Sequence, residues 1–158
     1  MELFLKLTIM VASFSEVGGW CPERLFWRGL VNDKFNDMVY LRNNTEPDSV
    51  VRLIETYFAD VGMILSELSL HVDTLKVDFA KLASLAREIE DKSTSIGAEH
   101  MRLACSDLIK ACDAEHKKNF SRTLPWVKNE FTNTRKKLDA VVQMERRIIR
   151  VWSSQSSN

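Results

Sequence analysis

The chain has 158 residues, which is enough for one domain with a single hydrophobic core. Its 22 basic and 22 acidic residues cancel to a formal net charge of +0, which argues against a nucleic-acid binder that relies on bulk positive charge. Only 5 Gly and 3 Pro accompany 45% hydrophobic residues, so long helices are favoured over many short strands.

The first residues form an apolar leader, residues 1–23, that differs in character from the rest of the chain. Its run LFLKLTIMVASFS has the apolar character of a secretory signal, but Glu2 makes its start acidic and Lys6 interrupts it. The run is also shorter than the roughly 20 apolar residues that a membrane-spanning helix needs. We expect no membrane association, and a cleaved signal stays an alternative.

The three cysteines, Cys21, Cys105 and Cys112, do not have the spacing of metal ligands. Their odd number indicates a reducing compartment, where the glycosylation sequons at Asn43 and Asn119 have no meaning. Cys105 and Cys112 lie seven residues apart on an apolar stripe, so we interpret them as buried small hydrophobic residues. No metal and no other cofactor is expected.

Two short helices are predicted before the first long one. Pro22 begins the first of them, because proline is tolerated in a first helical turn, and Gly29 ends it. Asn32 or Asp33 caps the second, which runs to about Leu41. The segment NNTEP then reads as a loop.

Four amphipathic helices follow, each marked by apolar residues spaced three and four apart. Their short links predict an all-α, up-down four-helix bundle. The polar end, residues 153–158, is expected to be disordered. The inward residues are Val50, Leu53, Ile54, Tyr57, Phe58, Val61, Ile64, Leu65 and Leu68 in the first helix, Phe79, Leu82, Leu85, Ala86 and Ile89 in the second, Met101, Ala104, Cys105, Leu108 and Cys112 in the third, and Phe120, Leu124, Val127, Phe131, Leu138, Val141, Ile148 and Trp152 in the fourth.

Pro125 lies early in the fourth of these helices, where its missing N–H removes a backbone hydrogen bond. We expect either a bend near Leu124 or a helix that begins only at about Thr123. A straight helix through this position would mean that the proline costs less than expected.

Several segments in a fixed order, GLVNDKF, YFAD, STSIGA, KNEF, KKLDAVVQME and RRI, carry a family resemblance. From about Arg24 to Val151 the chain resembles the plant histidine-containing phosphotransfer (HPt) family. In that family a bundle helix carries a signature of the form HQLKGSSSSIGA, whose His takes a phosphoryl group from one receiver domain and passes it to another. The resemblance implies an HPt domain over residues 24–152, built as a four-helix bundle with two short N-terminal helices.

The aligned stretch here reads REIEDKSTSIGA, and the shared S-x-S-I-G-A end fixes the register without a gap. Arg87 therefore stands in the place of the phosphorylatable His, Glu90 in the place of Lys, and Asp91 in the place of Gly. The helical period independently places Arg87 opposite the apolar stripe, in line with Ala80, Ser84 and Asp91, so its side chain projects into solvent. A guanidinium has no acceptor lone pair, so Arg87 cannot take up a phosphoryl group as an imidazole does.

The resemblance implies that receiver domains bind the face around Arg87. The expected receiver-binding residues are Ser84, Arg87, Glu88, Glu90 and Asp91 on this helix, with Ala59, Gly62 and Met63 on the preceding long helix. Alternatively, Arg87 with Glu90 and Asp91, three and four residues later, is an ordinary surface ion-pair cluster. That alternative is compatible with a loss of phosphotransfer.

The remaining histidines and the basic residues have ordinary interpretations. His71, His100 and His116 have no matching position in the family signature, so a relay role for them is a minor alternative. The basic run RRIIR, residues 146–150, is interpreted as a solvated helix face and not as a nucleic-acid patch, because the net charge is zero.

The resemblance leads to three hypotheses. The first is a monomeric pseudo-HPt protein, cytoplasmic and nuclear, that binds receiver domains of sensor histidine kinases and response regulators in cytokinin signalling, carries no phosphate and dampens the relay. It would not be an enzyme and would not bind nucleic acid. The second is an active phosphorelay mediator that uses another residue. The third is a helical adaptor that has left the pathway.

Overall fold

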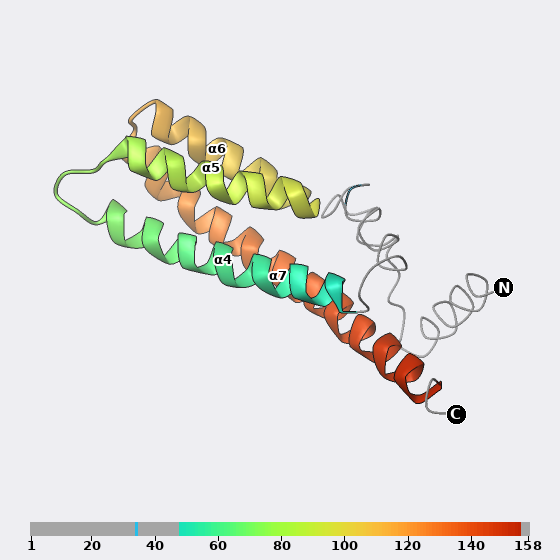
Figure 1. Cartoon of the computed structure of the whole chain (residues 1–158). Helices are drawn as coiled ribbons and strands as arrows, with labels where there is room; N and C mark the ends of the chain where they lie inside the picture. The colour runs from blue at the N-terminus through green and yellow to red at the C-terminus, as the bar shows by residue number, and fades with distance from the viewer. Residues whose placement is uncertain (1–33, 35–47, 156–158) are drawn as a thin grey trace.

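The computed structural model describes residue 34 and residues 48–155, and Figure 1 shows how the helices are arranged. They are α4 (Ser49–Val72), α5 (Phe79–Ile96), α6 (Glu99–Asp113) and α7 (Lys117–Gln155). Consecutive helices run in opposite directions, which confirms the all-α, up-down bundle. The predicted leader, the two short N-terminal helices and Cys21 lie outside the described residues.

The four helices pack in a ring, so each has two neighbours. The packed pairs are α4 with α5, α5 with α6, α6 with α7, and α4 with α7. Helices α5 and α7 therefore lie diagonally across the bundle, and their outer surfaces face opposite ways. Within residues 48–155, no helix combines the length and the apolar character that crossing a membrane requires.

The segment STSIGA ends α5 with a left-handed turn. Gly97 has φ 78° and ψ 24°, a conformation that costs glycine little because it has no Cβ. The N–H of Ala98 donates to the carbonyl of Ser93 at 2.8 Å, and the N–H of Gly97 donates to the carbonyl of Thr94 at 3.2 Å. These two bonds form a Schellman motif, so the end of the family signature is a helix stop.

The apolar core follows the predicted stripes closely, with one error on α4. Val61, Leu82, Ile89 and Leu138 have no exposed surface. Leu53 was expected to point inward, but 53% of its surface is exposed because it lies on the edge of the stripe, a quarter turn from buried Ile54.

A second group of predicted core residues lies at the margin of the bundle. Phe58, Phe79 and Leu85 are half-buried and pack against the core from its edge. Phe58 meets the edge of Phe131 at a centroid distance of 6.5 Å, and the guanidinium of Arg135 lies 5.5 Å from its ring centroid. The side chain of Trp152 lies outside the described residues.

Helix α7 is unbroken although Pro125 lies inside it. The expectation that it begins only at about Thr123 is therefore wrong, and a bend near Leu124 stays a prediction. The backbone N–H of Asn119 donates to Nδ1 of His116 at 3.1 Å, and this cap allows the helix to begin well before the proline.

The C-terminal end of α7 also departs from expectation. The predicted disordered tail, residues 153–158, begins inside the helix, which extends to Gln155. The hydroxyl of Ser153 donates to the carbonyl of Ile149 at 2.9 Å, and that of Ser154 donates to the carbonyl of Val151 at 2.8 Å. These bonds give both hydroxyls a backbone partner within the helix.

Replacing Pro125 should stabilise the bundle. Pro125 and Ser121, whose carbonyl loses its helical partner, are both exposed, so Pro125→Ala restores a backbone bond without disturbing the core. We expect a gain of about 1–3 kcal/mol in the free energy of unfolding, measured by urea titration. The control, Asn129→Ala at another exposed position of α7, should change stability by less than ~1 kcal/mol. A loss of stability on Pro125→Ala would contradict this account.

Thr134 offers a second test of the core. Its side chain is fully buried, and its Oγ1 has no hydrogen-bond partner among the described residues. Thr134→Val removes this polar atom at nearly constant volume, so we expect a gain of about 1–2 kcal/mol. Exposed Thr132 is the control, because its Oγ1 donates to the carbonyl of Lys128 at 3.1 Å and Thr132→Val should bring no gain.

Candidate functional site

The outer face of α5 presents Arg87 to solvent. Ala80, Ser84, Arg87 and Asp91 are all exposed, as the helical period predicts, and 53% of the Arg87 side chain is accessible. Glu88 is exposed on the same helix, nearer to α4. Residue 87 is therefore accessible to a partner.

The guanidinium of Arg87 binds a carboxylate on the neighbouring helix α6. Its Nη2 donates to both carboxylate oxygens of Asp113, at 2.9 and 3.2 Å. The expected pairing of Arg87 with Glu90 and Asp91 on its own helix does not form. Asp113 is 26 residues away, and only the packing register of α5 against α6 brings it near, so the sequence pattern carried no signal for it.

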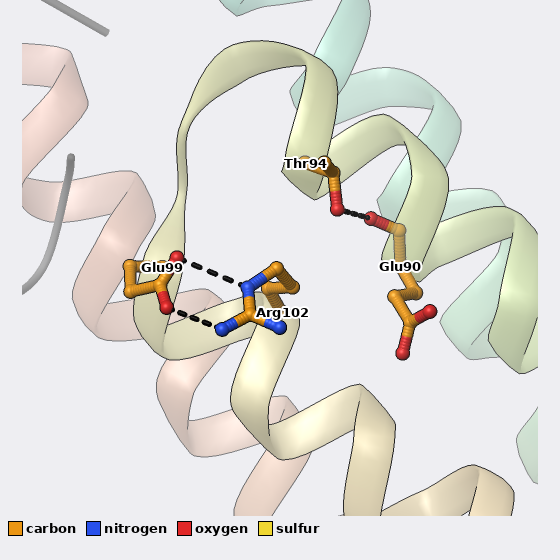
Figure 2. A network of polar contacts seen from close by, with 4 residues as sticks. All are labelled: Glu90, Thr94, Glu99 and Arg102. Atoms are coloured by element: carbon orange, nitrogen blue, oxygen red, sulfur yellow. Dashed lines mark hydrogen bonds and ion pairs between the residues drawn. The ribbon is translucent and has the colours of Figure 1, made fainter. Parts of the chain in front are cut away.

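Glu90 points toward α6 and away from the outer face. It is half-buried beside Arg102, whose guanidinium makes two hydrogen bonds to Glu99 (Figure 2). The bonds and charge of Glu99 raise the pKa of Arg102, and the charge of Glu90 adds to this effect. Glu90 was expected among the receiver-binding residues, and the structure places it in the seam between α5 and α6.

Polar contacts between side chains join α5 to α4. The hydroxyl oxygens of Tyr57 and Ser93 lie 2.8 Å apart in the buried interface, and burial raises the pKa of Tyr57 well above its ordinary value. Nearer the surface, Nζ of Lys92 donates to Oδ2 of Asp60 at 3.2 Å. The signature serine Ser93 is therefore a structural residue that joins two helices.

The α4 residues expected beside Arg87 divide between two flanks. Contacts of Tyr57 with Ser93, Asp60 with Lys92 and Glu67 with Lys81 fix an antiparallel register that puts Met63 level with Arg87. Met63 is 73% exposed. It lies seven residues, about two helical turns, after Thr56, which lines the groove between α4 and α5, so Met63 shares the flank of α4 that faces this groove.

Ala59 and Gly62 lie on the other flank of α4. Ala59 lines a cavity of about 340 Å³ together with Phe58 and with Arg135 of α7. Gly62 follows Phe58 by one helical turn and so shares that flank. Both were expected on the receiver-binding face. Ala59 instead lies beside α7, and a Cβ added at Gly62 would meet open space.

Each histidine of the bundle has a local partner away from Arg87. Nε2 of His71 lies 3.5 Å from a carboxylate oxygen of Glu67, and Nδ1 of His100 lies 3.5 Å from one of Glu130. His116 accepts the capping bond at the start of α7. The sequence interpretation of these residues as ordinary polar positions fits this geometry.

The two described cysteines are buried thiols. Burial, reinforced by the charge of Glu90, raises the pKa of Cys105 to about 12. Burial and Asp113 raise the pKa of Cys112 to about 11, and Arg87 opposes this rise. Both stay protonated at neutral pH, which confirms the interpretation as small hydrophobic residues. Within residues 48–155, no three potential metal ligands gather at one point.

The Tyr57–Ser93 contact predicts a stability effect inside the signature segment. Ser93→Ala leaves the buried Tyr57 hydroxyl without its partner, so we expect a loss of about 1–3 kcal/mol in thermal or urea unfolding. The matched control is Ser95→Ala, two residues later and exposed, which should change stability by less than about 0.5 kcal/mol. Equal effects of the two substitutions would show that the contact contributes nothing specific.

Comparison with known proteins identifies the bundle. No protein-family model matches the sequence. The chain is 29% identical to "Histidine-containing phosphotransfer protein 1" of Oryza sativa subsp. japonica, covering 80% of this chain and 86% of the relative. It is 26% identical to "Pseudo histidine-containing phosphotransfer protein 2" of the same organism, covering 80% of this chain and 83% of the relative.

Solved structures agree with the sequence relatives. The crystal structure of the maize histidine-containing phosphotransfer protein ZmHP2 matches with a TM-score of 0.75 at 25% identity, over 90% of this chain and 99% of that one. A Medicago truncatula protein, MtHPt2, matches in fold with a TM-score of 0.76 at 22% identity, over 82% of this chain and 88% of that one. The sequence relatives and the structural neighbours of this bundle are therefore plant histidine-containing phosphotransfer proteins.

Proposed function

We propose that this protein is a pseudo-HPt protein of a two-component phosphorelay. It binds receiver domains of sensor histidine kinases and response regulators, carries no phosphate and dampens the relay that those partners run. Within this proposal, the protein acts in cytokinin signalling, in the cytoplasm and the nucleus.

The observation that carries the proposal is Arg87 itself. The helix stop at Gly97 sets the register of the signature, and ten residues earlier, where the family has its phosphorylatable His, stands an exposed arginine. Attack on phosphorus needs a lone pair, which a neutral imidazole nitrogen has and a guanidinium does not. Arg87 can hold an anion but cannot become phosphorylated in the manner of a relay histidine.

The surroundings of Arg87 also oppose an incoming phosphoryl group. Asp113 already occupies the guanidinium at 2.9 Å, and exposed Glu88 and Asp91 add negative charge to the same helix. Lys92, the next cation along α5, is paired with Asp60 on the far flank. A transferred phosphoryl group would therefore meet carboxylates and would lack the charge compensation that phosphoryl transfer requires.

The same face remains suited to binding without chemistry. Arg87 and Asp91 lie on an exposed helical surface, with Met63 at the same level on α4 as an apolar contact. A receiver domain presents carboxylates at its active site, and one of these can replace Asp113 on the guanidinium. Electrostatic exchange of this kind favours orientation and association rate more than affinity.

Incubation with a phosphorylated receiver domain tests the proposal. We expect the protein to bind the receiver in a pull-down or calorimetric titration and to take up no acid-labile phosphate. Uptake at the rate of an ordinary HPt protein would overturn the proposal, and single His71→Gln, His100→Gln and His116→Gln variants would then identify the acceptor. A protein that binds no receiver at all would instead be a helical adaptor outside the relay.

Restoring the family residues should restore chemistry in steps. Arg87→His alone places an imidazole among Asp113, Glu90 and Asp91, so we expect transfer near background. The triple variant Arg87→His, Glu90→Lys, Asp91→Gly removes two of these carboxylates and adds a cation, so measurable transfer is expected. Efficient transfer by Arg87→His alone would show that the carboxylates do not oppose the reaction.

A further inference from the structure

The positive charge of this neutral chain is concentrated on one helix. Of the 22 lysines and arginines in the sequence, ten lie on α7, with three of the 22 acidic residues. Counted at about 100° per residue, nine of the ten fall within an arc of about 140°. These nine residues, here called the α7 basic face, are all exposed: Lys117, Lys118, Arg122, Lys128, Arg135, Lys136, Arg146, Arg147 and Arg150.

On the other three described helices the cations are paired with carboxylates. Every lysine and arginine of α4, α5 and α6 makes an ion pair with a carboxylate, and these six residues are Arg52, Lys81, Arg87, Lys92, Arg102 and Lys110. On the α7 basic face only Arg146 does so among the described residues, with Glu55 of α4. Arg135 stacks on Phe58, and the remaining seven have no carboxylate partner in the described part of the chain.

This segregation changes what the zero net charge implies. The expectation that RRIIR is a merely solvated face rests on charge averaged over the whole chain. At a Debye length of about 8 Å, however, a partner senses the charge of the face that it approaches. From Lys117 to Arg150 the face extends for about 50 Å along a rigid helix, with Asp139 as its one carboxylate.

The side chains between these cations indicate what kind of anion fits. They include Ser121, Asn129, Thr132 and Gln143, all exposed, and hydroxyl and amide groups are those that accompany Lys and Arg at nucleic-acid phosphates. The exposed large apolar residues of α7, Trp126 and Val151, fall outside the arc. A protein interface would need an apolar centre, and a membrane-bound helix would need an apolar face in the lipid.

We propose that the α7 basic face binds the phosphate backbone of a nucleic-acid duplex without reading its sequence. The row of exposed cations lies along the backbone and displaces condensed counterions, which is the driving force of such binding. Because α7 lies diagonally across the bundle from α5, the duplex and a receiver domain occupy opposite sides. The proposal is independent of the pseudo-HPt function.

The test measures fluorescence anisotropy of a labelled DNA duplex of about 20 base pairs, longer than the basic face, titrated with the full chain in a series of NaCl concentrations. At physiological salt we expect a Kd of about 10⁻⁶–10⁻⁴ M that weakens steeply as salt rises. The triple variant Lys128→Gln, Lys136→Gln, Arg147→Gln should lower the slope of log K against log salt by roughly 3 and weaken binding about tenfold or more.

The control variant removes the same charge elsewhere. Lys76→Gln, Lys81→Gln, Lys110→Gln changes three exposed lysines outside α7 and should bind the duplex within about twofold of wild type, because its α7 basic face is intact. Circular dichroism and thermal unfolding verify that both variants stay folded. Equal loss in the two triple variants would overturn the proposal, because binding would then follow net charge.

Two competing anions complete the test. Polyglutamate at matched charge and vesicles containing anionic phospholipid are each added to the labelled complex. We expect neither to displace the duplex at concentrations where unlabelled duplex does. Displacement by polyglutamate would reassign the face to an acidic protein, displacement by vesicles would reassign it to a lipid surface, and either result would overturn the proposal.

Discussion

The left-handed turn at Gly97 sets the geometry of the signature helix. Gly97, with φ 78°, ends α5, and two backbone hydrogen bonds satisfy carbonyl groups of its last turn. The next residue, Ala98, is buried. Helix α6 begins at Glu99, so the connection between the two helices is very short. Their antiparallel register therefore leaves little freedom, and it decides which side chains of α5 meet which side chains of α6.

That register decides the α6 neighbours of Arg87 and Glu90. Arg87 finds Asp113 near the far end of α6, and Glu90 lies beside Arg102 near its beginning. Arg87 is thus neutralised by Asp113, and Glu90 lies near the paired Arg102 and Glu99. In the same segment Ser93 joins α5 to α4, and Gly97 ends the helix.

Charge pairing divides the bundle into two surfaces that differ in electrostatics. On α4, α5 and α6 the cations are neutralised by nearby carboxylates, so the surface around Arg87 carries little net charge. On α7 the cations stand together with few carboxylates near them, so that surface carries a field that extends into solvent. A chain with no net charge can in this way present one neutral side and one strongly positive side.

Much of this structure was predictable from the sequence by periodicity. The predicted inward residues of α6, and those of α7 whose side chains are described, are buried, and the period of α5 correctly predicted that Arg87 is exposed, because a helix in water must bury its apolar stripe. The errors concern residues at the edge of an apolar stripe, where the helical period alone does not decide which way a side chain faces. Leu53, Ala59 and Gly62 are such residues. The predicted start of α7 was also wrong. His116 caps the helix before Pro125, and the proline does not interrupt it.

The sequence by itself determined the fold class, the place of the helix stop and the absence of a phosphorylatable side chain at residue 87, because these depend on local pattern and residue chemistry. Only the tertiary structure decided which charges are paired. The partner of Arg87 is 26 residues away. Among the described residues, every cation of α4, α5 and α6 is paired, whereas on the α7 basic face only Arg146 is, and this difference depends on neighbouring helices. Charge interactions act through space, and the distances that govern them exist only once the helices are packed.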